Sequence, residues 1–124
     1  PAPPWDGETV LYHAMPAGLR TQMRRRIHPE LFVDIARVLA TKRRMLASHR
    51  SQKDWLDVSQ GMDAYLHTME QLAREVGEMS GRFQFAEGWR RHSHLGYGRP
   101  DYDPLPALLK DHCWLDPDYA RSLE

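Results

Sequence analysis

The chain has 124 residues, and its 17 lysines and arginines balance its 17 aspartates and glutamates, so the formal net charge is zero. This length fits one small domain with a modest core, and the balanced charge argues against a general attraction to nucleic acid or to an anionic membrane. The single cysteine, Cys113, excludes an internal disulfide and is compatible with a reducing compartment, so we expect a cytoplasmic protein.

The start of the sequence shows no targeting segment. Residues 1–10 lack the basic patch and the apolar run of a signal peptide, and no run in the chain approaches the roughly 18 apolar residues of a membrane span. The first residue is Pro1 rather than methionine. We therefore expect the numbering to start inside a longer protein.

The first 30 residues predict little regular structure. Residues 1–8 are rich in proline and indicate a linker or a ragged end. Residues 9–15 are β-branched, aromatic and almost uniformly semi-apolar, which predicts a short strand covered on both faces. Residues 17–30 are polar and basic and could form a helix.

Two amphipathic helices are predicted in the middle of the chain. Apolar residues recur every three or four positions over residues 34–49, and Asp34 stands where an N-cap would accept hydrogen bonds from the first turn. A second apolar stripe runs from Met62 to Val76 and ends near Gly77 and Gly81. Its methionines are typical of core packing, which is favoured over a pliable binding groove.

The last third of the chain predicts one more strand. Residues 82–90 partly alternate, so Phe83, Phe85 and Trp89 would share one face of a strand or extended segment. Residues 104–110 could form one helical turn, and we expect the remainder of residues 98–124 to be irregular. Two short strands do not make a stable sheet, so these elements are expected to form part of an α/β domain.

Glu87 is a candidate functional carboxylate because it lies between Phe85 and Trp89. Burying an unpaired carboxylate is costly, so either an arginine pairs with Glu87 or its side chain faces a polar cavity. The candidate arginines are Arg82, Arg90 and Arg91. Spacing alone favours a structural ion pair.

Histidine clusters offer two further candidates. His92 and His94 would point to the same side of an extended segment, which allows two ligands of one metal, but the spacing shows no third ligand and favours two surface histidines. His49 falls in the last turn of the first predicted helix, where it suits the helix dipole, and Gln52 could satisfy free carbonyls there. No nucleophile elbow, phosphate loop or dinucleotide fingerprint is present.

Several short motifs, in order, resemble the C-terminal part of the LmbE-like, or PIG-L, N-deacetylases. The resemblance covers residues 9–97, and its specificity lies in the order and spacing of motifs that are each short; residues 98–124 match no part of the family pattern. The motifs are the strand at Val10–His13, F-V-D-I at Phe32–Ile35, Lys42, H-R-S-Q at His49–Gln52, and F-A-E-G-W-R at Phe85–Arg90.

The resemblance implies a Rossmann-like α/β fold and zinc-dependent hydrolysis of an N-acyl group, usually acetyl on an amino sugar. In such an enzyme a metal-bound water attacks the amide, and an aspartate acts as general base. The family's H-P-D-D motif and its later metal-binding histidine are both absent, and the segment from His28 to Leu31 lacks the two aspartates. The resemblance therefore implies a partner, the missing N-terminal half, that supplies zinc and the catalytic residues.

The resemblance also assigns roles to three residues of this chain. Glu87, His49 and Gln52 become candidate contacts to a small N-acetylated substrate, while no catalytic residue and no zinc ligand is expected within the chain. Phe85 stands where the family often has tyrosine, which removes one hydroxyl contact. The alternatives left open are a small non-catalytic helical interaction module and a metal-binding protein that uses His92 and His94. Homo-oligomerisation is possible in each case.

Overall fold

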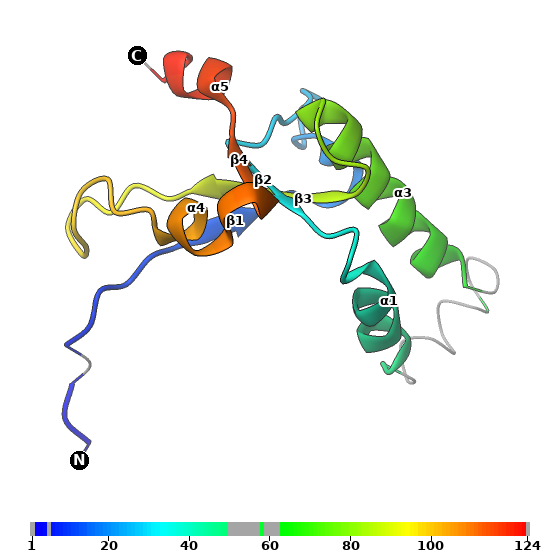
Figure 1. Cartoon of the computed structure of the whole chain (residues 1–124), viewed down its shortest axis with the longest axis horizontal. Helices are drawn as coiled ribbons and strands as arrows, with labels where there is room; N and C mark the ends of the chain where they lie inside the picture. Colours follow the sequence, from blue (N-terminus) through cyan, green and yellow to red (C-terminus); the bar gives the residue numbers. More distant parts are fainter. Residues whose placement is uncertain (1, 5, 50–57, 59–62, 124) are drawn as a thin grey trace.

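The computed structural model describes residues 2–4, 6–49, 58 and 63–123 and has a mixed α/β fold around a four-stranded antiparallel sheet (Figure 1). Its elements in chain order are β1 (Tyr12–Ala14), the 3-10 helix η1 (Ala17–Leu19), β2 (Leu31–Asp34), α1 (Leu39–Ala47), α3 (Ala64–Ser80), β3 (Ala86–Arg91), α4 (Pro104–Leu109), the 3-10 helix η2 (Lys110–His112), β4 (Cys113–Leu115) and α5 (Pro117–Arg121). No helix in these described ranges is long and apolar enough to cross a membrane.

The strands lie in the order β1-β3-β2-β4, so β3 and β2 are central. Glu87 of β3 is opposite Val33 of β2, while the pairing of β3 with β1 stops where Trp89 is opposite Ala14. Residues 86–88 therefore have a strand partner on the β2 side and, within the described part of the chain, none on the β1 side. This segment is called the open edge of β3 below.

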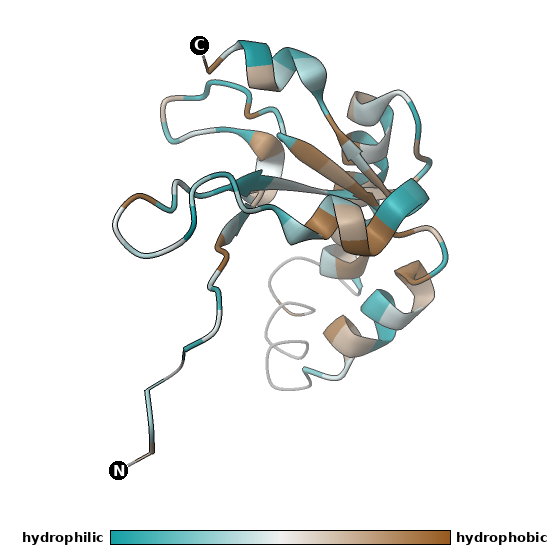
Figure 2. Ribbon diagram, turned by 60° about the vertical axis from the view of Figure 1, so that its left-hand side comes forward, coloured by the Kyte–Doolittle hydropathy of each residue, from teal (hydrophilic) through white to brown (hydrophobic). Residues whose placement is uncertain are grey.

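The hydrophobic core lies between the sheet and α3. Phe32 of β2 and Ala86 of β3 are buried against Val76 of α3 and Leu19 of η1. Figure 2 shows hydrophobic residues concentrated in the strands and in the helix segments around them, whereas the N-terminal segment is largely hydrophilic. Helix α3 ends at Gly81, whose φ of 63° suits glycine and lets its N–H bond to the Glu78 carbonyl.

The first predicted strand is shorter and more exposed than its composition suggests. Strand β1 covers only Tyr12–Ala14, and the side chains of His13 and Ala14 are exposed. The expectation that both its faces are covered is wrong, because two of the three side chains of this edge strand are exposed. Residues 17–30 form η1 and an irregular segment, closed by a bridge between Arg20 and Arg26, in place of the possible helix.

Helix α1 begins at Leu39, five residues later than predicted. Asp34 is the last residue of β2, and its Oδ1 accepts a hydrogen bond from the Ala36 N–H at 2.9 Å. Asp34 therefore stabilises a turn and is not the N-cap of α1, whose first flanking residue is Val38. The prediction failed because Ile35 and Val38 fit the apolar spacing of the helix although they lie in the turn between β2 and α1.

Residues 98–124 contain the predicted helical turn, α4, and also β4 and α5 in the part that was expected to be irregular. Strand β4 completes the sheet, with Trp114 opposite Phe32 of β2. Both helices begin with proline after aspartate, at Asp103-Pro104 and Asp116-Pro117. Proline suits the first helical position because its missing N–H is not needed there, and aspartate can cap that end. The second Asp-Pro pair, at Asp116, was therefore a signal for the helix start that was missed.

Candidate functional site

Glu87 of β3 forms an ion pair with Lys42 of α1. The Lys42 Nζ lies 2.6 Å from Glu87 Oε1, and the two side chains are 37% and 31% exposed. An ion pair with that much solvent contact contributes at most about 1 kcal/mol to folding. Stability alone is therefore a weak reason for a lysine and a glutamate to meet at this point.

None of the three candidate arginines pairs with Glu87. The Arg90 guanidinium donates to the His28 carbonyl, Arg91 lies 3.6 Å from Asp101, and Arg82 stacks over Trp114. Arg90 cannot easily reach Glu87, because side chains alternate along a strand and residues 87 and 90 point to opposite faces of β3. The partner comes instead from α1, which sequence spacing could not bring next to β3.

A cavity of about 400 Å³ lies beside the open edge of β3. Lys42 and Glu87 line it together with apolar side chains of α3 and of the segment that follows β1. The apolar members include Met15, Leu19, Met69, Leu72, Ala73 and Val76. A largely apolar cavity with a few convergent polar groups is typical of a small-molecule site, and its volume is within the usual range for one.

Tyr65, in the first turn of α3, adds a polar group to this cavity. Its hydroxyl is buried and has no hydrogen-bond partner within the described residues. A buried donor left unpaired costs about 1–3 kcal/mol, so a ligand oxygen in the cavity would gain from binding it. Tyr65 falls in the apolar stripe of the second predicted helix and was not expected to be a polar group of the site; the one signal was its hydroxyl in a stripe that otherwise has no hydrogen-bonding group.

Two adjoining cavities bring further residues to Glu87. One, of about 530 Å³, is lined by His49, Lys42 and Glu87 along with the apolar face of α1. The other, of about 330 Å³, lies on the α4 side and is lined by Glu87, Tyr12 and Trp89 among others. Glu87 lines all three cavities. The structure thus brings His49 and Glu87 together, while the third predicted contact, Gln52, lies outside the described residues.

The residues around Glu87 do not fit a zinc centre. Within the described ranges, no group of three or more histidine, cysteine, aspartate or glutamate side chains is arranged to hold a metal ion. The segment from His28 to Leu31 shares only its first two residues with the H-P-D-D metal motif, and its polar side chains have other contacts. The His28 imidazole bonds to Asp116, and the Glu30 carboxylate accepts the Arg91 backbone N–H. We therefore derive no reaction step through zinc from these residues.

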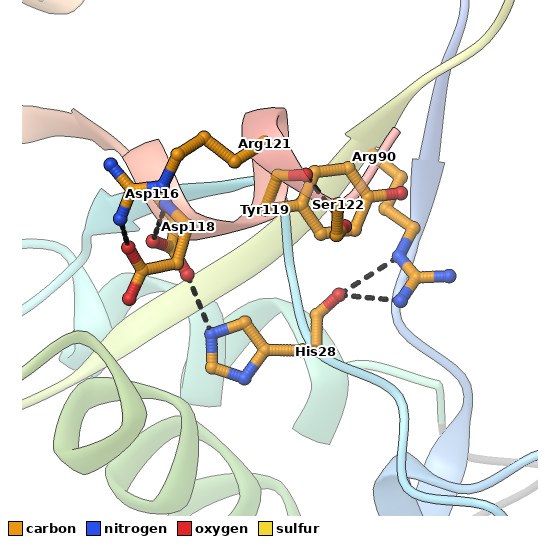
Figure 3. A network of polar contacts seen from close by, with 7 residues as sticks. All are labelled: His28, Arg90, Asp116, Asp118, Tyr119, Arg121 and Ser122. Atoms are coloured by element: carbon orange, nitrogen blue, oxygen red, sulfur yellow. Dashed lines mark hydrogen bonds and ion pairs between the residues drawn. The ribbon is translucent and has the colours of Figure 1, made fainter. Parts of the chain in front are cut away.

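A second polar cluster joins the C-terminal segment to the sheet (Figure 3). Asp116 is 8% exposed; its Oδ2 lies 2.8 Å from His28 Nε2, and its Oδ1 accepts the Asp118 N–H to cap α5. Arg90 donates twice to the His28 carbonyl and stacks over Tyr119. Because none of these side chains lines the three cavities, the cluster is best explained as a clamp that fixes α5.

Cys113 of β4 has a protected thiol. Burial, and then the nearby Asp103 carboxylate, raises the pKa of this thiol above its ordinary value. A higher pKa leaves less thiolate at neutral pH, so alkylation of the folded chain by iodoacetamide should be slower than that of the urea-unfolded chain. The folded rate should keep rising with pH beyond the point where the unfolded rate levels off. Equal rates in the two states at pH 7.5 would contradict this account.

Comparison with known proteins identifies no relative: no family model, no curated protein and no solved structure matches the chain. The features of this chain that bear on its function are therefore the cavities and the motifs that meet there.

Proposed function

We propose that residues 9–97 are the C-terminal part of an LmbE-like, Rossmann-like N-deacetylase and that they supply a wall of its substrate pocket. One observation supports this most directly. Lys42, His49 and Glu87 come from three separate motifs of the resemblance, and all three line one cavity. Motifs that share a substrate would be expected to meet in this way.

The chemistry of the cavities suits an N-acylated amino sugar. The Glu87 carboxylate can accept hydrogen bonds from sugar hydroxyl groups, and Lys42 and Tyr65 can donate to hydroxyl or carbonyl oxygens. The apolar side chains of Met69 and Leu72 suit the C–H face of a sugar ring or an acyl methyl group. The residues of this wall bind and orient the substrate.

In the proposed enzyme, zinc and the residues that activate water belong to a partner segment outside this chain, the N-terminal half of the family. Bound zinc would supply the nucleophilic water. The open edge of β3 suits such a partner, because residues 86–88 have no paired strand on the β1 side within the described residues. A cytoplasmic location is part of the same proposal.

The proposal predicts that Glu87→Gln weakens sugar binding. N-acetylglucosamine titrated into the ¹⁵N-labelled chain should shift amide signals of Lys42, Met69 and Glu87 in a saturable way. The amide keeps the shape of the carboxylate but loses its charge, and a hydrogen bond to a charged group is worth about 1.5–3 kcal/mol, so the affinity should fall about tenfold or more. Glu78→Gln, on an exposed position of α3, is the matched control and should bind like the unmodified chain.

The same pair of variants tests the reaction in the longest protein that the gene encodes. Zinc-dependent acetate release should fall about tenfold or more with Glu87→Gln and remain unchanged with Glu78→Gln. Identical binding and turnover in both variants would reject Glu87 as a substrate contact. If no sugar binds in a saturable way, the alternative of a helical interaction module is favoured. For that alternative, Met45 of α1 and the flanking Val38 offer exposed apolar side chains.

A further inference from the structure

Two exposed histidines from neighbouring strands have their ring nitrogens face to face. His13 Nε2 of β1 lies 2.7 Å from Nδ1 of His92, which directly follows β3. The backbone sets this spacing, because the His92 N–H donates to the Leu11 carbonyl at 2.9 Å and so continues the pairing of β1 with β3. The two imidazoles are therefore held together by the sheet, although they are 79 positions apart in the sequence.

The spacing of the pair is close to that of two ligands on one metal ion, although the two nitrogens now face each other and the rings must turn so that both lone pairs point at the metal. The ring centroids are 4.9 Å apart and the ring planes are inclined by 50°. Metal–imidazole bonds of about 2.0–2.1 Å at angles of roughly 90–110° hold two nitrogens about 2.9–3.4 Å apart. The pair therefore needs to open from 2.7 Å by about 0.2–0.7 Å, which exposed side chains allow. The ring that donates the present hydrogen bond would shift its proton to its other nitrogen.

The charged neighbours of the pair are bound to other groups. Arg90, opposite His13 in the sheet, directs its guanidinium to the His28 carbonyl and to Tyr119 (Figure 3). Arg91 lies 3.6 Å from the Asp101 carboxylate. Both cations therefore interact with groups outside the histidine pair.

His94 is not the partner of His92. It is 4% exposed, and its Nδ1 faces the Arg99 carbonyl at 3.3 Å. The sequence-based pairing of His92 with His94 assumed a continuous extended segment, but β3 ends at Arg91. The structure replaces His94 with His13 as the second candidate ligand.

We propose that His13 and His92 form a two-imidazole site for a divalent transition metal, with water completing the coordination shell. Two imidazoles suit Cu²⁺, Ni²⁺ and Zn²⁺, whereas Mg²⁺ and Ca²⁺ prefer oxygen ligands. The general order of affinity places Cu²⁺ first. The site depends on these two side chains alone and needs neither a sugar substrate nor a partner segment.

The test is a titration of the chain with CuCl₂ and ZnCl₂ alone. We expect one saturable site per chain, with paramagnetic broadening by Cu²⁺ strongest at residues next to His13 and His92. His13→Ala and His92→Ala should each lower the affinity by about tenfold or more, because loss of a ligand costs at least as much as loss of its supporting contacts. Circular dichroism of each variant verifies that it is folded.

His67→Ala is the matched control, since His67 is an exposed histidine on α3. The control should leave the affinity and the broadening pattern unchanged. The proposal is overturned if both His13→Ala and His92→Ala bind as tightly as the unmodified chain, or if the broadening centres on other histidines. A failure of sugar binding has no bearing on this result, because the titration contains no sugar.

Discussion

Phe32→Ala is expected to destabilise the fold by about 3–5 kcal/mol, the usual cost of truncating a fully buried phenylalanine. Phe32 is 0% exposed. Its ring lies 5.4 Å from the Trp114 ring and 5.8 Å from the His28 ring, so it connects β2 to β4 and to the segment before β2. Because small domains have total stabilities of about 5–15 kcal/mol, this loss should remove a large fraction of the stability and lower the urea midpoint clearly.

Urea unfolding monitored by tryptophan fluorescence measures this loss of free energy. Phe32→Leu keeps most of the buried apolar volume and should cost clearly less than Phe32→Ala. Leu95→Ala is the surface control, because Leu95 is 92% exposed and its truncation should change stability by no more than about 0.5 kcal/mol. A Phe32→Ala variant as stable as Leu95→Ala would show that the core between sheet and α3 does not form.

Periodicity predicted the long elements well because each is decided locally. The stripe that includes Leu66, Ala73 and Val76 is the buried face of α3, and Gly81 ends the helix as its conformational freedom suggests. Aromatic and small residues around Glu87 predicted an extended segment, and β3 forms there. These signals need no knowledge of distant residues.

The short strands were missed because distant pairing decides them. Strand β2 has four residues, Leu31–Asp34, and its apolar run is equally compatible with the first turn of a helix. Strand β4 has three residues, Cys113–Leu115, too few for an alternating pattern to be visible. Both strands are stabilised by their neighbours in the sheet. Strand β2 lies between β3 and β4, and β4 pairs with β2.

The candidate site was only partly predictable for the same reason. Glu87 and His49 were identified from motif position, and they line one cavity. Lys42 was noted as a family residue, but its contact with Glu87 spans 45 positions and depends on how α1 packs. The meeting of His13 with His92 likewise depends on strand register, which short-range spacing cannot fix.

Gly88→Ala is expected to destabilise the fold by about 3 kcal/mol, at the upper end of typical overpacking costs. A Cβ on Gly88 would lie 2.9 Å from Pro29 Cβ, closer still to Pro29 Cγ, and 3.0 Å from Met15 Cγ. The Pro29 side chain is fully buried and its ring is rigid, so it cannot move aside as a flexible side chain would. Glycine at this position therefore lets the segment before β2 pack directly on β3.

A double-mutant cycle with Pro29→Ala separates this collision from other effects of the new methyl group. Pro29→Ala removes Cγ, the atom in closest conflict, so Gly88→Ala should cost at least about 1 kcal/mol less in that background than in the unmodified chain. Urea midpoints of the four proteins supply the coupling energy. Equal costs in the two backgrounds would mean that Pro29 does not lie against Gly88. Gly88 directly follows Glu87 in β3 and lines the same cavity, so this contact holds the strand beside the candidate site.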